Sequence, residues 1–275
     1  MWEYDVSLFA SAVRPHLWPE LLKSLEDNKR NYEIIFAGNV PPSFTHKNLI
    51  YIETKNIKPA QCYEIARRAC RGELVGWIAD DCRFSPRFID KVYDFYKSVD
   101  STYPIIVSCK TNENEKDEGM NHHRFFDRNL NTPKMAPLAI MTREYLECLG
   151  GIDSRYISGQ YENDIVMRAL SNGAKTYVIN DVCVTIDHLK FHGVETKFWD
   201  SYDHDRQVLE DSWCIGGCQP NPEPIIQLSY KHSQPPTWYR PIKNVEVTLV
   251  RNDVFQSYPP EISLTESFGP KGIFD

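Results

Sequence analysis

A short apolar run that ends in two adjacent carboxylates constrains this chain more than any other feature. Leu74 to Ile78 has the pattern of a buried strand, and Asp80 and Asp81 follow it at once. Carboxylates at the carboxyl end of a buried strand lie where open α/β sheets bind ligands. Two neighbouring carboxylates repel each other, and a divalent cation would relieve that repulsion and could hold a diphosphate. The alternative is that both acids only cap the next helix or form a turn.

Strand and helix patterns alternate along most of the chain. The predicted strands are 6–9, 32–36, 49–52, 74–78, 105–108, 138–142, 175–179 and 182–186, and the predicted helices are 18–25, 59–70, 88–96 and 162–170. Pro59 suits the first position of its helix, and Gly173 suits the cap after the last one. Residues 112–121 are polar and predict a surface loop. This alternation predicts an α/β fold with a mainly parallel sheet flanked by helices.

The composition changes after about residue 215, where prolines cluster and helical periodicity disappears. We expect one domain over residues 1–215 and an irregular extension over residues 216–275 that packs on it. A short strand is expected at Val245–Val250 within the extension.

Charge and hydropathy exclude several classes of protein. The net charge of -7 over 275 residues disfavours a dedicated nucleic-acid binder, although it does not exclude one. No apolar run approaches the ~20 residues that span a bilayer, and the acidic start of the chain does not resemble a signal peptide. The 8 cysteines are irregularly spaced, which favours reduced thiols, and Cys214 with Cys218 is a weak zinc candidate. We expect a soluble cytoplasmic protein without a transmembrane segment.

Two further acidic clusters follow Asp80-Asp81 along the chain. Glu162-Asn163-Asp164 begins a predicted helix, and Asp187-His188 ends the predicted strand Val182–Ile186. Taken singly, acids at a helix start favour its dipole, and a lone histidine after a strand is usually a hydrogen-bonded or surface residue. The order and spacing of all three clusters favour a functional site.

With these residues in place, residues 5 to 190 resemble the family 2 glycosyltransferases, which have the GT-A fold. The stretch Ala69 to Asp81 is similar to the helix, A-x-G-E turn and strand that lead to the family's D-x-D metal motif. Gly151-Ile152-Asp153-Ser154-Arg155 and the later Glu162 to Arg168 are similar to the family's G-x-D-x-R and E-D-x-D-L-x-L-R segments.

The resemblance implies a role for each matched residue. Asp81 and His188 would hold Mn²⁺ or Mg²⁺, with Asp80 standing in for the first acid of the motif. Glu162 matches the catalytic base and Asp164 the acid two residues later. Ala10 to Arg14 matches the first nucleotide-contacting loop, so the expected donor-binding residues are Ala10, Ala12, Arg14, Gly38, Asn39 and Asp80. The chain departs from the family at Ala37-Gly38-Asn39, where an Asp pair is usual, and in the first loop, which lacks the usual Pro and Asn.

The chemistry of sugar transfer explains why such residues are needed. A cation neutralises the charge on a leaving diphosphate, and a carboxylate within hydrogen-bond reach takes the acceptor's proton. We expect the helix N-terminus to help keep Glu162 ionised. The resulting hypothesis is a metal-dependent inverting glycosyltransferase that moves a sugar, with a UDP-sugar favoured as donor, to a hydroxyl on a glycan.

Other functions stay open at this stage. The acceptor could be a modified DNA base or a protein side chain. The chain could also be a nucleotidyltransferase, or a non-catalytic module that has kept the fold, although the acids Asp81, Glu162 and Asp164 are present. Four aromatic residues could form an acceptor platform or could only pack the extension onto the core: Trp199, Trp213, Trp238 and Tyr239.

Overall fold

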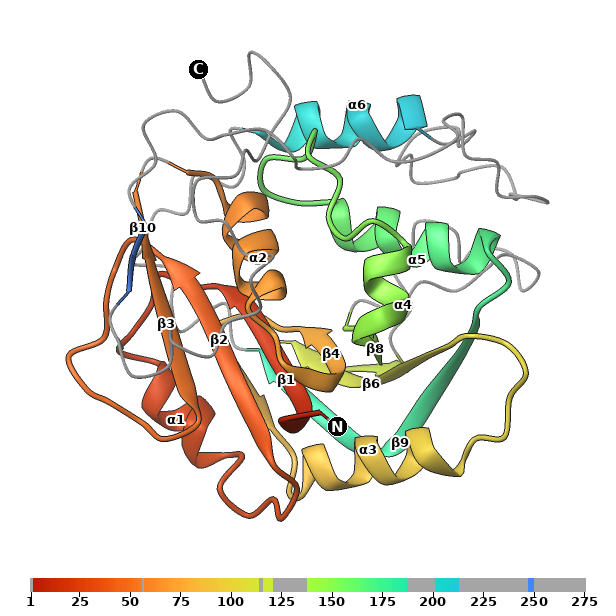
Figure 1. The fold of residues 1–275 in the computed structure, drawn as a ribbon, viewed down its shortest axis with the longest axis horizontal. Coiled ribbons are helices and arrows are strands. Elements are labelled where there is room, and N and C mark those ends of the chain that lie inside the picture. The colour runs from red at the N-terminus through yellow and green to blue at the C-terminus, as the bar shows by residue number, and fades with distance from the viewer. Residues whose placement is uncertain are drawn as a thin grey trace.

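The computed structural model describes residues 2–55, 57–113, 116–120, 138–186, 201–212 and 247–249. Within these residues the strands join in one 10-stranded sheet, in the order β10-β3-β2-β1-β4-β8-β6-β9-β5, with β7 paired to β6 (Figure 1). The strands are β1 Tyr4–Ser11, β2 Tyr32–Gly38, β3 Leu49–Thr54, β4 Gly72–Trp77, β5 Cys82–Phe84, β6 Ile105–Glu113, β7 Lys116–Met120, β8 Ile140–Thr142, β9 Lys175–Ile186 and β10 Val247–Leu249. The helices are α1 Trp18–Lys23, α2 Pro59–Arg68, α3 Phe88–Ser98, α4 Arg143–Cys148, α5 Tyr161–Ser171 and α6 Tyr202–Ser212.

The sheet is mixed, and its N-terminal part is parallel. β1 pairs in parallel with β2 and β4, and β2 pairs in parallel with β3. β8 then joins β4 and β6 in antiparallel fashion, and β6 pairs in parallel with β9. The carboxyl ends of β1, β2 and β4 therefore meet at one edge of the sheet, where the sequence predicted a ligand site. The prediction of an α/β sheet flanked by helices is confirmed.

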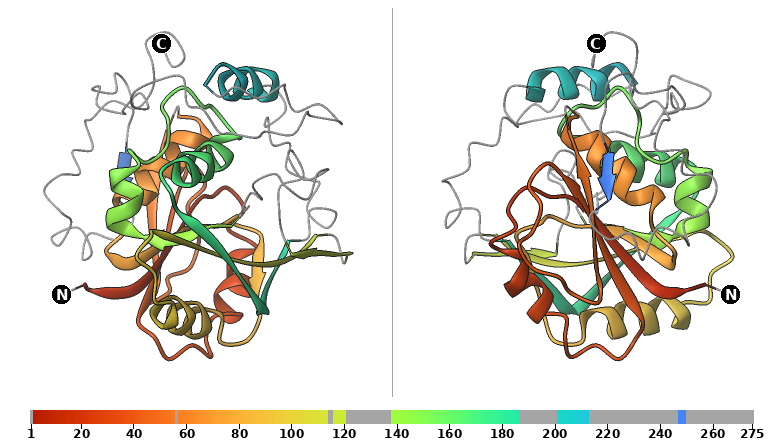
Figure 2. Two further views of the ribbon diagram at one scale, coloured as in Figure 1. Left: turned by 90° about the vertical axis from the view of Figure 1, so that its right-hand side faces the viewer. Right: turned by 60° about the vertical axis from the view of Figure 1, so that its left-hand side comes forward.

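Helices cover both faces of this sheet. α1 and α3 lie on one face, and α2, α4 and α5 lie on the other (Figures 1 and 2). Each face buries its own apolar cluster, one around Trp18, Phe36 and Phe88 and the other around Trp77, Ile65 and Val166. β2 is buried along its whole length, as expected for a strand covered on both sides.

Two predicted segments differ from the structure. Residues 175–186 form one strand instead of two, because a register shift beside Cys109 leaves residues 180–182 outside the ladder. The exposed Asn180 and Asp181 in this irregularity gave the sequence pattern of a turn. The predicted loop at 112–121 lies partly in strands, because β6 runs to Glu113 and β7 pairs with it. Within the described residues β7 has no second strand beside it, and edge strands tolerate polar sequences.

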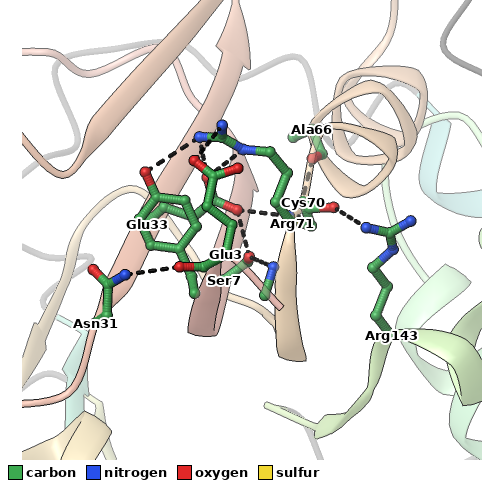
Figure 3. Close-up of polar contacts among 10 residues, drawn as sticks. Glu3, Ser7, Asn31, Glu33, Ala66, Cys70, Arg71 and Arg143 are labelled. Carbon is green, nitrogen blue, oxygen red and sulfur yellow. Dashed lines mark hydrogen bonds and ion pairs between the residues drawn. The ribbon is translucent and has the colours of Figure 1, made fainter. Parts of the chain in front are cut away.

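A buried ion pair ties together the amino ends of β1, β2 and β4 (Figure 3). Glu33 of β2 accepts hydrogen bonds from the Ser7 Oγ at 2.6 Å and from the Arg71 backbone N–H at 2.6 Å. The Arg71 guanidinium bonds the other oxygen of Glu33 at 3.0 Å and also reaches Glu3 at 2.8 Å. Burial raises the pKa of Glu33, and Ser7 and Arg71 oppose that rise. This cluster fixes the end of the sheet opposite to the predicted site.

The structure also bears on the expectations about membrane spans, cysteines and the C-terminal extension. No helix in the described part of the chain is long and apolar enough to cross a membrane. The six cysteines of the described residues are free thiols, and Cys148 is exposed. The strand expected at Val245–Val250 is present as β10, which pairs with β3. The rest of the predicted extension lies outside the described residues, so the division at residue 215 stays a prediction.

Candidate active site

The loop after β1 is organised by Asp80, which follows β4. The backbone N–H groups of Val13 and Arg14 both donate to Oδ2 of Asp80 at 2.8 Å. The indole N–H of Trp18, at the start of α1, points at the same oxygen from 3.4 Å. β4 and β1 are neighbours in the sheet, so their two carboxyl ends are joined here by a buried carboxylate. The predicted first loop and the predicted acidic turn are therefore one structural unit.

Arg14 bridges the two adjacent carboxylates. Its Nε donates to Oδ1 of Asp80 at 2.8 Å, its Nη2 contacts the same oxygen, and its Nη1 donates to Oδ2 of Asp81 at 2.6 Å. Burial would lower the pKa of Arg14, but the two carboxylates raise it above its usual value. The sequence-based argument expected a cation to relieve the repulsion between the two acids. A guanidinium from the loop after the neighbouring strand β1 does so in the structure, which the local sequence around Asp80 could not reveal.

The turn after β2 lies directly against this loop. The N–H of Ala12 bonds the carbonyl of Ala37 at 2.9 Å, which continues the β1–β2 pairing past Ser11. A Cβ on Gly38 would lie 1.9 Å from the Ala12 carbonyl oxygen, so only glycine allows this approach. Ala10 and Ala12 are buried, whereas Asn39 is exposed. The structure thus brings the loop after β1 and the turn after β2 together, and Asn39 is exposed beside them.

Glu162 lies in the first turn of α5, on the other side of a tyrosine of α2. The Tyr63 hydroxyl donates to the carbonyl of Ile78 at 2.7 Å, just before Asp80, and the ring packs 5.0 Å from that of Tyr161. Burial raises the pKa of Tyr63, and the charges of both Glu162 and Asp80 add to the rise. Tyr63 therefore lies between the acidic turn and the start of α5.

Burial acts on the carboxyl of Glu162, an effect that the sequence-based expectation did not include. Its Oε2 is buried and has no hydrogen-bond partner among the described residues. Burial raises the pKa of Glu162 to about 7, and the charge of Asp205 contributes to the rise. Burial thus opposes the effect expected of the helix N-terminus, because desolvation favours the neutral carboxyl. A carboxyl with such a pKa can exchange a proton under ordinary conditions.

Asp164 has a different environment, although it is only two residues away. Its side chain is fully buried, and its Oδ2 accepts from Nε of Arg168 at 2.9 Å. Arg168 also donates to the carbonyls of Gly151, at 2.7 Å, and Leu149. Asp164 thus anchors α5 to the turn that contains Gly150 and Gly151. In this arrangement Asp164 holds the loop that precedes α5 through Arg168.

The sequence reasoning missed α6, which lies beside the loop that leads into α5 (Figure 1). Asp205 of α6 accepts hydrogen bonds at 2.8 Å from three successive backbone N–H groups, those of Ile157, Ser158 and Gly159. The two aliphatic residues of this helix, Val208 and Leu209, are adjacent, so its sequence shows no clear helical periodicity. The acids at 203 and 205, near the start of a stretch without Pro or Gly, were the available indication.

The candidate metal ligands are only partly described. Asp81 lies at the expected strand end, while His188 lies outside the described residues, as do Trp199, Trp213, Trp238, Tyr239, Cys214 and Cys218. Within the residues that the structure describes, no three His, Cys, Asp or Glu side chains gather in a metal-binding cluster. Both oxygens of Asp80 accept hydrogen bonds from Arg14, so Asp80 organises the loop.

With the site described, the fold can be compared with known proteins. Comparison of the sequence with models of protein families and with curated proteins finds no match. Among solved structures, the chain has the fold of the GT-A glycosyltransferases. TarS 1-349 from S. aureus in complex with UDP-GlcNAc matches with a TM-score of 0.51 and 16% identity, over 75% of this chain and 66% of that one. The same protein in complex with UDP matches with a TM-score of 0.51 and 14% identity, over 74% and 70%.

Proposed function

We propose that this protein is a metal-dependent inverting glycosyltransferase that transfers a sugar from a nucleotide-sugar to a hydroxyl group of a glycan. One observation carries the proposal: Tyr63 lies between an acidic turn at the carboxyl ends of β1 and β4 and a carboxyl, Glu162, whose pKa is about 7. The first element suits a nucleotide diphosphate, and the second suits a base for the acceptor. The GT-A fold supports the same reading.

The donor would lie against the loop after β1 and the turn after β2. Gly38 keeps these two segments in close contact, and Asp80 holds the backbone of Val13 and Arg14 in place. Ligands of open α/β sheets lie at this edge. A UDP-sugar is the favoured donor, and the two TarS complexes, which contain UDP and UDP-GlcNAc, are in keeping with that choice.

The cation proposed for the acidic turn is Mn²⁺ or Mg²⁺. Such hard cations are commonly held by one or two carboxylates together with substrate phosphates, without a cage made entirely of protein groups. Asp81 supplies a carboxylate at the carboxyl ends of the parallel strands, and His188 is the second proposed ligand. When bound, the cation would neutralise charge on the leaving diphosphate.

Glu162 would act as the base. Its ionised carboxylate would accept the proton of the acceptor hydroxyl while the acceptor oxygen bonds the sugar's anomeric carbon and the bond to the diphosphate breaks. Because its pKa is about 7, a large fraction is ionised at neutral pH, and the protonated form can release its proton again. Asp164 is engaged with Arg168, so it would support the loop and leave proton transfer to Glu162.

A nucleotide-sugar panel tests this function. The wild-type protein is heated with each nucleotide-sugar, with and without Mn²⁺, and the midpoint of thermal unfolding is recorded. We expect a UDP-sugar to raise the midpoint only when Mn²⁺ is present, because a ligand that binds the folded state stabilises it. The stabilising donor is then incubated with candidate glycans and the release of UDP is measured. Stabilisation without release from any acceptor or from water would favour a binding module, and no stabilisation by any donor would reject the proposal.

A further inference from the structure

The side chain of Asp205 lies in a backbone pocket made by the loop that precedes the proposed base. Its Oδ1 accepts from the N–H of Ile157, and its Oδ2 accepts from the N–H groups of Ser158 and Gly159, all at 2.8 Å. Asp205 is 1% exposed. Backbone N–H groups can only donate, so three of them favour the ionised carboxylate and oppose the effect of burial, which raises the pKa of Asp205.

The remaining contacts of α6 reach the same loop. The Arg155 guanidinium donates to Oγ of Ser212 at 2.7 Å and to Asp153 at 2.6 Å, while its carbonyl lies 3.0 Å from Nε2 of His204. Leu209 of α6 is fully buried in the apolar cluster on this side of the sheet. Residues of α6 from His204 to Ser212 therefore hold residues 155–159 by hydrogen bonds.

This loop determines how α5 begins. Gln160 follows it with a left-handed backbone, φ 63°, and Tyr161 and Glu162 come next in the first turn of α5. The N–H of Ala60, at the start of α2, also bonds the carbonyl of Ile157 at 2.9 Å. A shift of residues 157–159 would thus move Glu162 relative to Tyr63 and the acidic turn.

We infer that Asp205 is a positioning residue for the proposed reaction, which fixes the backbone leading into Glu162 and places a second negative charge close to it. This inference rests on the proposed function only for its catalytic part, because the hydrogen bonds and the charge act in any case. The groups that interact electrostatically with Glu162 are Tyr63 from α2, Tyr161 from its own helix and Asp205 from α6. Of these three groups, Asp205 is the one whose charge raises the pKa of Glu162.

The test compares Asp205→Asn with a matched control, Asp203→Asn. Both changes remove one carboxylate from the first turn of α6. The Asp203 side chain, however, is 91% exposed, and its ion pair with Arg206 is long, at 3.8 Å. We expect amide hydrogen exchange at Ile157, Ser158 and Gly159 to become at least about tenfold faster in Asp205→Asn, because bonds to a charged acceptor are lost. Exchange in Asp203→Asn should match the wild type. Equal protection in both variants would overturn the inference.

A second readout follows the carboxyl of Glu162 directly. Its ¹³C resonance, assigned by its absence in Glu162→Gln, is titrated with pH in the wild type and in both variants. The midpoint should lie near 7 in the wild type and Asp203→Asn and fall in Asp205→Asn, because a neighbouring negative charge has gone. An unmoved midpoint in Asp205→Asn would show that Asp205 does not act on Glu162.

Asp205→Glu keeps the experiment decisive if Asp205→Asn does not fold. It retains the charge but displaces it by one methylene, so amide exchange at residues 157–159 should accelerate while the Glu162 midpoint stays near that of the wild type. Unchanged exchange in this variant would overturn the inference. Transfer assays separate the two proposals. If amide exchange and the Glu162 titration change as expected but the wild type has no transfer activity, the function is rejected and the effect of Asp205 on the loop is kept. Wild-type transfer rates and a wild-type pH profile in Asp205→Asn would keep the function and reject Asp205 as a positioning residue.

Discussion

Arg14 bonds both oxygens of the Asp80 carboxylate, through its backbone N–H to Oδ2 and through Nε to Oδ1, each at 2.8 Å. The same guanidinium reaches Asp81. One residue therefore fixes the loop after β1 and neutralises the acidic turn after β4. The shape of the loop after β1, part of the proposed donor site, therefore depends on this pair.

Removal of the Arg14 guanidinium should destabilise the fold. In Arg14→Ala, two buried carboxylates lose their shared counter-charge, and breaking a buried pair in this way costs about 3–5 kcal/mol. Arg14 is partly exposed, so we expect about 2–4 kcal/mol, measured by urea unfolding. Arg83→Ala is the control, because Arg83 pairs with exposed Glu20 at 3.5 Å and should cost below about 1 kcal/mol. Equal costs for the two variants would refute the bridging role.

The raised pKa of Glu162 predicts a pH-dependent gain in stability on its replacement. The folded-state pKa of about 7 lies above the value of 4.5 for an unperturbed Glu, so the folded state binds more protons between these values. Wild-type stability should therefore fall as pH rises from about 5 to 7, by an amount on the order of 2–3 kcal/mol. Glu162→Gln should remove this dependence and be more stable than the wild type at pH 8 but not at pH 5.

A parallel variant isolates this effect from a change in net charge. Glu147→Gln removes an exposed carboxylate from α4 and should leave the pH dependence of unfolding unchanged. If Glu162→Gln gave the same pH profile as Glu147→Gln, Glu162 would have an ordinary pKa and the argument from desolvation would fail.

Two glycines should respond differently to alanine. Gly38→Ala places a Cβ 1.9 Å from the backbone oxygen of Ala12, so the loop must move, and we expect a loss above about 2 kcal/mol together with weaker nucleotide binding. Gly173→Ala meets no atom within 4 Å but forces alanine to φ +83°, which should cost about 1–2 kcal/mol and leave nucleotide binding unchanged. Thermal unfolding and nucleotide titration check both. Wild-type nucleotide affinity in Gly38→Ala would exclude this turn from the donor site.

The buried pair at the opposite end of the sheet gives a stability prediction separate from function. Glu33→Gln leaves the Arg71 guanidinium its ion pair with the half-exposed Glu3 (Figure 3) and should cost about 2–4 kcal/mol. Glu3→Gln removes the outer partner of the same guanidinium and should cost below about 1 kcal/mol. Denaturant titration decides, and a larger cost for Glu3→Gln would reverse the assignment.

The sequence predicted the elements of the central sheet and the acids at its edge, because apolar periodicity and strand-end carboxylates are local signals. It could not predict that Arg14 crosses to Asp80 and Asp81, which depends on the pairing of β1 with β4. The sequence also placed Glu162 at a helix N-terminus, which favours the ionised form, but it could not show the burial that raises the pKa of this carboxyl. The contacts of Asp205 could not be predicted from the sequence, because three backbone N–H groups 46 to 48 residues away carry no sequence signature.

Calorimetric titration with UDP in the presence of Mn²⁺ tests the central proposal most directly. The wild type, Glu162→Gln and the exposed control Asp94→Asn should each bind one UDP with similar affinity, whereas Asp81→Asn should bind at least about tenfold more weakly. Removing Mn²⁺ with a chelator should weaken binding to the wild type by a similar factor. No binding of UDP to the wild type, or equal binding to Asp81→Asn, would contradict a metal-assisted nucleotide site at Asp81.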